Sequence, residues 1–189
     1  MYKKILSTVL VVLLLSFGVL RAQSTGIDVI DVILKGYSAK QFTTNPVSDS
    51  DIDLIIKCGM KAPSGRNMQP WKFTVVKDQA TTGRILQNIT DGNILIIVSG
   101  QARQDGTVNP FDCALATENM YVAAQALGLG AHIYAGPVGN INSTWKEKLG
   151  IPADYQAVTV LRIGSIDRGV DAVSSASTRK KPEEVVSYR

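Results

Sequence analysis

Two side-chain amides lie two residues apart in a short polar stretch that precedes a strand-like run. The stretch extends from Ala62 to Trp71, with the sequence APSGRNMQPW, and its amides are Asn67 and Gln69. Each amide offers both a hydrogen-bond donor and an acceptor, which suits the edge of a flat heteroaromatic ring. An ordinary polar loop between a helix and a strand has much the same composition, so the stretch needs support from the rest of the chain.

Residue types for acid–base or metal chemistry are scarce. The only histidine is His132, and the sequence has no HExxH, CxxC or acidic calcium-loop pattern, so we expect no metal site. A serine hydrolase using Ser64 would need a general base within hydrogen-bond reach. His132 falls in a strand pattern, which favours a packed core histidine over that base. Cys58 and Cys113 each sit in an apolar helical pattern, which favours free buried thiols over a disulfide.

The length and charge of the chain restrict its class. Its 189 residues, 45% of them hydrophobic, suffice for one ordinary domain with a core. Three of the 20 Lys and Arg residues and none of the 16 acidic residues fall in residues 1–24, so residues 25–189 carry a net charge of +1. A domain so close to neutral has no electrostatic footprint for nucleic acid.

Residues 1–24 are predicted to be a signal peptide. Lys3 and Lys4 form a positive start, residues 5–20 are mostly apolar, and Ala22-Gln23-Ser24 has small residues where a signal peptidase cleaves. We expect an exported protein, periplasmic in a bacterium, with residues 25–189 as its single domain. The alternative is an uncleaved membrane anchor through residues 5–20, although this run is shorter than a spanning helix needs.

Helical and strand patterns alternate after this segment, which predicts one sheet between helical layers and an α+β or α/β class. A helix is expected to begin at Ser48, which has Asp51 at capping-box spacing, and to end by Pro63. The other expected helices are 27–36, 81–88, 110–127 and 143–149, and the expected strands are 72–76, 94–98, 131–135 and 156–163. From Gly164 onward the chain is polar and basic, so this tail either wraps over the domain or a partner subunit, or is disordered.

Four segments, in this order, resemble the FMN-dependent nitroreductase family. They are residues 37–42 (YSAKQF), 62–71, 126–130 (ALGLG) and the closing 180–186 (KKPEEVV). The resemblance covers roughly residues 27–187, and its second segment is the most specific. It implies an α+β fold with a mixed β-sheet flanked by helices, and a homodimer in which FMN lies at the subunit interface and the C-terminal segment embraces the partner.

The resemblance also implies an activity. An FMN-dependent oxidoreductase of this kind passes electrons from NAD(P)H to an electron-poor acceptor, a nitroaromatic or a quinone, by a ping-pong mechanism. Because the flavin carries the chemistry, no catalytic side chain is expected. The alternative is a flavin-binding protein without turnover, a carrier or scavenger of FMN.

Cofactor contacts carried over from the family fall in four places. Ser38 and Lys40 match its phosphate and flavin-edge contacts, and the strand end at Ala135 and Gly136 matches the backbone near flavin N5. The C-terminal segment offers two cations for the phosphate. The full set implied by the resemblance is Ser38, Lys40, Pro63, Ser64, Asn67, Gln69, Ala135, Gly136, Arg179 and Lys181.

The sequence departs from the family at two points. Gly36 stands where an Arg is usual, so one phosphate contact is missing or moved. The stretch between Val76 and Asn93 is short, which implies a minimal member with an open pocket.

Overall fold

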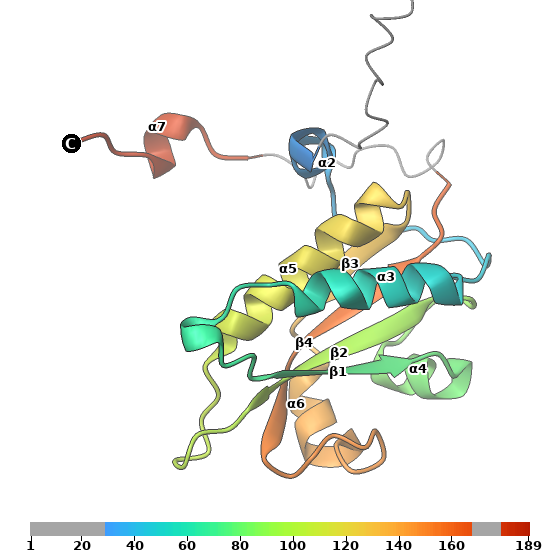
Figure 1. The fold of residues 1–189 in the computed structure, drawn as a ribbon. Coiled ribbons are helices and arrows are strands. Elements are labelled where there is room, and N and C mark those ends of the chain that lie inside the picture. The colour runs from blue at the N-terminus through green and yellow to red at the C-terminus, as the bar shows by residue number, and fades with distance from the viewer. Residues whose placement is uncertain (1–28, 168–178) are drawn as a thin grey trace, which may run out of the picture.

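The computed structural model of the chain describes residues 29–167 and 179–189 (Figure 1). The predicted signal peptide, residues 1–24, therefore lies outside the described residues. Within them, no helix has the length and apolar character to cross a membrane. The elements in chain order are α2 (Val29–Lys35), α3 (Asp49–Met60), the 3-10 turn η1 (Gly65–Asn67), β1 (Trp71–Val76), α4 (Gln79–Ile85), β2 (Ile94–Gln101), α5 (Pro110–Ala126), β3 (Gly130–Tyr134), α6 (Val138–Asn140), the π-helical segment η2 (Ile141–Trp145), β4 (Tyr155–Gly164) and α7 (Pro182–Val185).

The four strands form one sheet in the order β1-β2-β4-β3. Every pairing among the described strands is antiparallel, so this sheet is not mixed as the resemblance implied. A parallel pair would need a further strand beyond these four. The segregation of helices around an antiparallel sheet makes the fold α+β, as expected.

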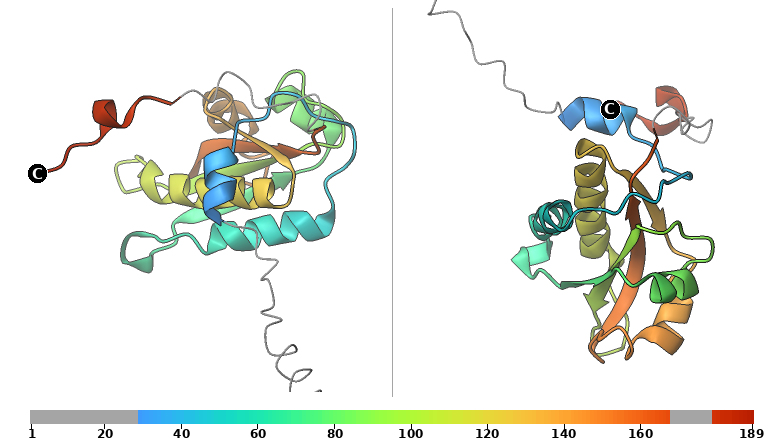
Figure 2. Two further views of the ribbon diagram at one scale, coloured as in Figure 1. Left: turned by 90° about the horizontal axis from the view of Figure 1, so that it is seen from above. Right: turned by 90° about the vertical axis from the view of Figure 1, so that its right-hand side faces the viewer.

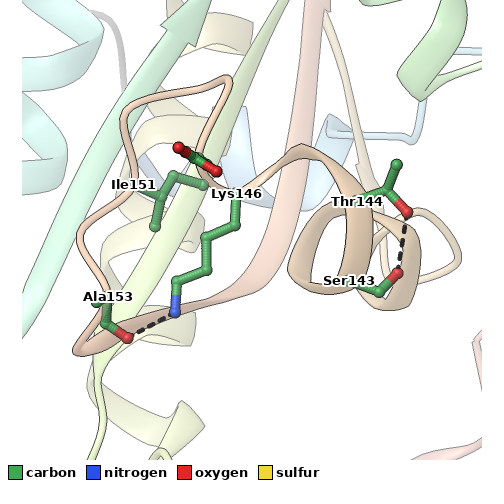
Figure 3. A pocket seen from close by; sticks show the side chains of 6 residues that line it. Ser143, Thr144, Lys146, Ile151 and Ala153 are labelled. Atoms are coloured by element: carbon green, nitrogen blue, oxygen red, sulfur yellow. Dashed lines mark hydrogen bonds between the residues drawn. The ribbon is translucent and has the colours of Figure 1, made fainter.

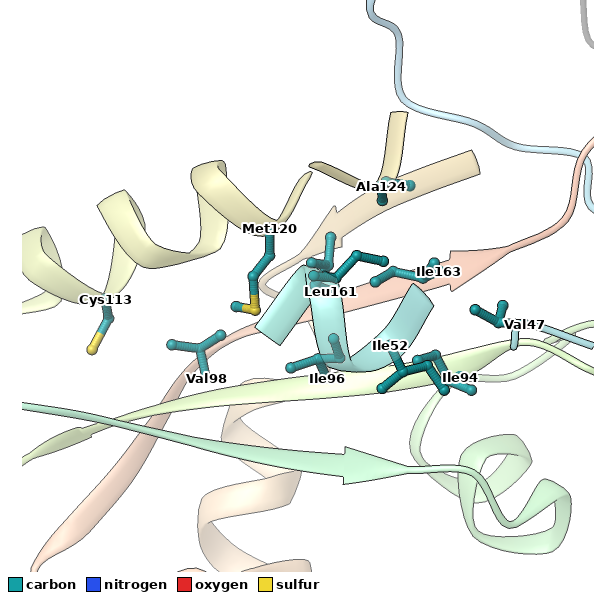
Figure 4. Close-up of a cluster of buried hydrophobic side chains, with 12 residues drawn as sticks. Val47, Ile52, Ile94, Ile96, Val98, Cys113, Met120, Ala124, Leu161 and Ile163 are labelled. Carbon is teal, nitrogen blue, oxygen red and sulfur yellow. The ribbon is translucent and has the colours of Figure 1, made fainter. Parts of the chain in front are cut away.

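Helices cover both faces of the sheet (Figure 2). Strand β2 is buried along residues 94–100, because its side chains alternate between the two faces and both faces are covered. On one face α3 and α5 close over a cluster that includes Ile96, Met120 and Leu161 (Figure 4). On the other face α4 and residues 138–151 close over Leu95, Ile97 and Val160. The continuous apolar run at 94–98 is thus the strand buried on both faces that the sequence predicts.

The longest described helix, α5, has the ends that its sequence predicts. Asn109 caps it with a side chain that accepts from the Phe111 amide, and Pro110 occupies its first turn. Its C-terminus passes into Gly128 at a φ of 81°, a left-handed conformation that favours glycine. The predicted cap of α3 is also present, because Ser48 Oγ accepts from the Asp51 amide at 3.1 Å.

Residues 143–149 depart from the prediction of an ordinary helix. The structure has a short α-helical turn that continues into the π-helical segment Ile141–Trp145 and then into turns. Asn142 explains part of this irregularity, since its side chain exchanges two hydrogen bonds with the backbone of Ala157 on β4. That long-range pairing is invisible to a periodicity argument.

Two terminal elements expose apolar side chains. Helix α2 buries none of its residues, and its Ile33 and Leu34 are 57% and 76% exposed. The C-terminal segment carrying α7 projects away from the body of the domain (Figure 1), and its Tyr188 is 95% exposed. Both elements therefore present apolar surface that the described residues do not cover.

Both cysteines are free, as expected, but they differ in burial. Cys113 is fully buried, whereas Cys58 is only half-buried. Desolvation raises the pKa of the Cys113 thiol to about 11, and the neighbouring Asp112 carboxylate adds to this shift. The thiolate is the reactive form, so Cys113 is inert at neutral pH.

We expect the native protein at pH 8 to react with a thiol reagent at Cys58 alone, and at both cysteines in guanidinium chloride. Because folding raises the pKa of Cys113, its protonated thiol favours the folded state fully below the ordinary pKa of 9.0, and this contribution fades as the pH approaches about 11. The chromophore that the reagent releases gives the number of reacting thiols per chain. The variant Cys113→Ser, which has only Cys58, identifies which thiol reacts in the native protein. Equal native reaction rates for the two thiols would contradict the burial.

Candidate functional site

The loop between α3 and β1 has an unusual backbone. Arg66, Asn67 and Gln69 have φ values of 53°, 56° and 47°, and Asn88 is the only other described non-glycine residue with a positive φ. Each such residue costs on the order of 1–3 kcal/mol and persists only where its surroundings hold it. The loop of residues 64–69 is thus locally strained. We call it the amide loop.

The two amides of this loop are hydrogen-bonded to each other. Gln69 Nε2 donates to Asn67 Oδ1 at 3.2 Å, and both residues are exposed. This pairing leaves the Asn67 NH₂ group as a donor and the Gln69 carbonyl oxygen as an acceptor for a ligand. Donor and acceptor groups side by side are what the edge of a flat heteroaromatic ring requires, so the predicted role of the two amides stays a prediction.

Ser64 has a structural partner in the same loop. Its Oγ accepts a hydrogen bond from the Gln69 amide at 3.0 Å, which closes the turn. His132, the only histidine, contacts the Ala39 carbonyl through Nδ1 at 2.8 Å. Because a carbonyl oxygen only accepts, that nitrogen carries the hydrogen. Among the described residues Ser64 and His132 have separate partners, which does not support a Ser–His nucleophile pair.

The segment that contains Ser38 and Lys40 is anchored through the residue between them. Ala39 is 1% exposed, its amide donates to the Ala131 carbonyl at 3.1 Å, and its own carbonyl accepts from His132. Side chains on either side of Ala39 therefore point away from this anchor, and both Ser38 and Lys40 are exposed. Lys40 is available to an anionic ligand.

Helix α5 holds the start of the same segment. Gln125 Oε1 accepts from the Tyr37 amide at 3.0 Å, and Tyr121 OH shares a hydrogen bond with Ser38 Oγ at 3.4 Å. The two α5 residues are four positions apart and so lie on one face of the helix. A Cβ at Gly36 would lie 2.7 Å from Gln125 Oε1 and 2.9 Å from the Val32 carbonyl oxygen. Gln125 therefore fills the space beside the position where the family has Arg.

A buried arginine holds the far end of the segment. Arg162, on β4, is 5% exposed and lies 3.9 Å from the centre of the Phe42 ring. Its Nε donates to Asn93 Oδ1 at 2.8 Å, and Nη2 donates to Thr90 Oγ1 at 3.0 Å. Desolvation lowers the pKa of this guanidinium, yet Arg remains charged in proteins. Asn93 in turn donates to the Thr43 carbonyl, so the segment is fixed on both sides of Lys40.

The end of strand β3 is open. Ala135 and Gly136 are exposed, and a Cβ at Gly136 would meet no atom within 4 Å. Packing within this chain therefore does not require glycine there, and the backbone is accessible to a ligand.

The remaining predicted residues lie in the C-terminal segment. Arg179 and Lys181 are exposed, and the Lys181 amide caps α7 by donating to the Glu184 carboxylate at 3.0 Å. In the single chain this segment extends away from the sheet (Figure 1). No hydrogen bond or ion pair between described residues joins Arg179 or Lys181 to Ser38 or Lys40 of the same chain.

The predicted residues form separate groups rather than one pocket. The amide loop contacts α5 at Asp112, in its first turn, whereas the Ser38–Lys40 segment contacts α5 at Tyr121 and Gln125. These attachment points are 9 to 13 residues apart, or roughly 14–20 Å along the helix axis. No hydrogen bond between described residues joins the two groups, and the ten site residues stay a prediction for a cofactor at a subunit interface.

A cavity of about 440 Å³ lies elsewhere, beside the π-helical segment (Figure 3). Lys146 Nζ donates to the Ala153 carbonyl at 2.7 Å across it. None of the ten predicted residues lines this cavity, and the hydroxyls of Ser143 and Thr144 at its rim bond to each other. It has no donor set that points to a particular ligand.

Sequence reasoning missed the residues that position the site. Asp112, Tyr121 and Gln125 on α5, and Arg162 on β4, all act through contacts far apart in the chain. The four-residue spacing of Tyr121 and Gln125 on a predicted helix was the one available signal, since it places both on one face.

Solved structures share this fold. A Bacteroides thetaiotaomicron protein, provisionally named NADH dehydrogenase/NAD(P)H nitroreductase, is 26% identical, with a TM-score of 0.69 over 87% of this chain and 98% of that chain. A protein of Desulfovibrio desulfuricans, provisionally named a nitroreductase and solved in complex with FMN, is 26% identical, with a TM-score of 0.70 over the same shares of the two chains. The protein is therefore in the class of nitroreductase-like folds.

Sequence comparison defines the class further. The model described as "Nitroreductase family" matches residues 33–95 and 82–165. A protein of Archaeoglobus fulgidus, provisionally named NADH dehydrogenase/NAD(P)H nitroreductase, is 32% identical over 140 residues, which are 67% of this chain and 79% of the relative. The chain belongs to the nitroreductase family.

We expect Gly36→Ala to destabilise the protein by about 1–2 kcal/mol, because the added methyl group must displace Gln125 and the Val32 carbonyl. Thermal unfolding of the variant measures this change. Gly139→Ala is the matched control, since a Cβ there meets no atom within 4 Å. Equal melting temperatures for the two variants would show that the space beside Gly36 is not filled as described.

Proposed function

We propose that this protein is an FMN-dependent oxidoreductase that passes electrons from NAD(P)H to an electron-poor acceptor, a nitroaromatic or a quinone, by a ping-pong mechanism. The paired amides of Asn67 and Gln69 carry the proposal, because they leave one donor and one acceptor exposed in a strained loop. Family membership supports it, as do the nitroreductase names of its relatives and the FMN in the Desulfovibrio desulfuricans protein.

The chemistry of the donor set fits FMN. Lys40 and Ser38 offer a cation and a hydroxyl for the phosphate, and Arg179 and Lys181 offer two further cations. Asn67 and Gln69 would bind the ring edge, with Pro63 and Ser64 shaping the loop, and the open backbone at Ala135 and Gly136 would lie beside the ring. Bound FMN supplies the hydride and electron chemistry, so the protein's part is to bind, orient and shield.

We also propose that two copies of the chain complete each site. The separation of the amide loop from the Ser38–Lys40 segment along α5 supports this assignment, because each chain offers only part of the donor set at one place. The exposed apolar residues of α2 and the extended C-terminal segment supply surface for a homodimer. Arg179 and Lys181 would then reach the partner's phosphate site.

Flavin binding without turnover is the second candidate. The observation that favours it is Gln125, which fills the space beside Gly36 where a cationic phosphate contact is usual in the family. A carrier or scavenger of FMN would bind the flavin and fail to oxidise NAD(P)H with any acceptor.

The cellular location remains a proposal from the sequence. Export to the periplasm through residues 1–24 is preferred, with an anchor through residues 5–20 as the alternative. N-terminal sequencing of the protein recovered from its cellular fraction separates the two.

Purified protein is expected to show flavin absorbance in the near ultraviolet and the blue, and to oxidise NADH or NADPH when a quinone or nitroaromatic acceptor is added.

Lys40→Ala should raise the dissociation constant for FMN about tenfold or more, through loss of a charge-assisted contact. Titration of the protein into FMN, followed by flavin fluorescence, measures this dissociation constant. The control is Lys148→Ala, an exposed lysine beside Trp145. Flavin bands without NAD(P)H oxidation would select the carrier, and unchanged FMN affinity would remove Lys40 from the site.

The double variant Ile33→Asp/Leu34→Asp is expected to be monomeric and to lose FMN, because two charges on α2 oppose burial of its apolar surface. Light scattering after size-exclusion chromatography gives the mass, with Ala80→Asp on α4 as the control. A wild-type monomer that retains FMN would contradict a site shared between two chains.

A further inference from the structure

We propose that Asp112 is a positioning residue that holds the amide loop in the shape that presents Asn67 and Gln69 to the flavin. The proposal rests on the proposed function for the identity of the ligand. The latch itself is a contact within this chain. Asp112 Oδ1 accepts a hydrogen bond from the Gly65 amide at 3.2 Å, across 47 positions of the sequence.

The strain of the loop requires such a latch. Arg66, Asn67 and Gln69 all hold positive φ angles, a costly state for Arg and Gln and a milder one for Asn. A free segment of this composition would relax to other conformations. The loop therefore needs contacts that select this conformation before a ligand arrives.

Most hydrogen bonds of the loop are local and move with it. The Asn67 amide donates to the Ser64 carbonyl, the Met68 amide donates to the Gly65 carbonyl, and the Gln69 amide donates to Ser64 Oγ. Among the described residues, the bond from Gly65 to Asp112 is the one that ties residues 64–69 to a distant element. It pins the first residue of the 3-10 turn, from which the positions of Asn67 and Gln69 follow.

Asp112 is not required to cap its own helix. The cap of α5 is Asn109, whose side chain already accepts from the Phe111 amide at 3.1 Å. Asp112 is only 8% exposed, and no described Lys or Arg forms an ion pair with it. Burial of a carboxylate is costly, although the N-terminal end of the helix dipole offsets part of that cost. The Gly65 amide is the described donor that uses this buried oxygen.

Two conservative variants separate a latch from a helix charge. Asp112→Asn keeps a side-chain oxygen at the same distance from the backbone and removes the charge. Asp112→Glu keeps a charge in the first turn of α5 but moves the acceptor by one methylene group. A latch predicts that Asn preserves the loop and Glu disturbs it, whereas a charge that only stabilises the helix predicts the reverse.

Trypsin cleavage after Arg66 reports the loop in the protein without flavin, because Arg66 is exposed and lies inside it. The cleavage rate, followed by mass spectrometry, is expected to rise about tenfold in Asp112→Ala and Asp112→Glu, and to stay within about twofold of wild type in Asp112→Asn. The dissociation constant for FMN should follow the same order. Glu118→Ala, which removes an exposed carboxylate from the same helix, is the matched control and should change neither.

An unchanged cleavage rate in Asp112→Ala, or wild-type behaviour of Asp112→Glu with a loss in Asp112→Asn, would overturn the latch. Should Asp112→Ala fail to fold, the Asn and Glu variants carry the comparison. Wild-type protein that binds no FMN would refute the proposed function while leaving the cleavage test of the latch intact. Wild-type protein that binds FMN with the loop insensitive to position 112 would refute the latch alone.

Discussion

Helix α5 is the rigid part on which both halves of the candidate site depend. Its 17 residues span roughly 25 Å, and its inner face packs into the core through Cys113, Ala116, Met120 and Ala124. The small side chains let the helix approach the sheet closely, so it has little freedom to shift or rotate. Its start holds the amide loop through Asp112, and its last turns hold the Ser38–Lys40 segment, so one packed element sets the distance between them.

The Ser38–Lys40 segment has a second support, the buried Arg162 on β4. Arg162 is a buried cation without a described carboxylate partner, which is a costly arrangement. The hydrogen bonds to Asn93 and Thr90 and the contact with the Phe42 ring offset that cost. Because Phe42 belongs to the same segment as Lys40, the buried cation fixes the backbone that carries the exposed one.

Patterns within one element predicted the fold well. The continuous apolar run at 94–98 is the doubly buried strand, and Pro110 and Gly128 mark the ends of α5, since these signals depend on local periodicity and backbone freedom. The π-helical segment at 141–145 was missed, because Asn142 exchanges hydrogen bonds with β4, which a local pattern does not contain. The antiparallel sheet also differs from the mixed sheet that the resemblance implied.

The residues of the candidate site divide in the same way, into those that a local pattern reveals and those that only the packed fold brings together. The amide loop was visible because its donors and acceptors are adjacent in sequence. Its strain was not predicted, and only the positive φ angles of Arg66, Asn67 and Gln69 reveal it. Asp112 was invisible, because a carboxylate in the first turn of a helix is an ordinary feature. Its partner Gly65 lies 47 positions away, and only the packed fold brings the two together.

The glycine at position 36 gains a physical meaning from the same helix. Sequence alone presents it as the loss of a cationic contact, but the structure shows a position already occupied by the Gln125 amide, which binds the Tyr37 backbone. A long side chain at 36 and this Gln125 rotamer exclude each other. The segment is therefore held by a neutral amide from α5, and its exposed cation is Lys40. A phosphate dianion bound here would carry more charge than Lys40 alone neutralises, so further cations would have to come from elsewhere. The C-terminal segment, which carries Arg179 and Lys181, extends away from the domain and is a described source of such cations.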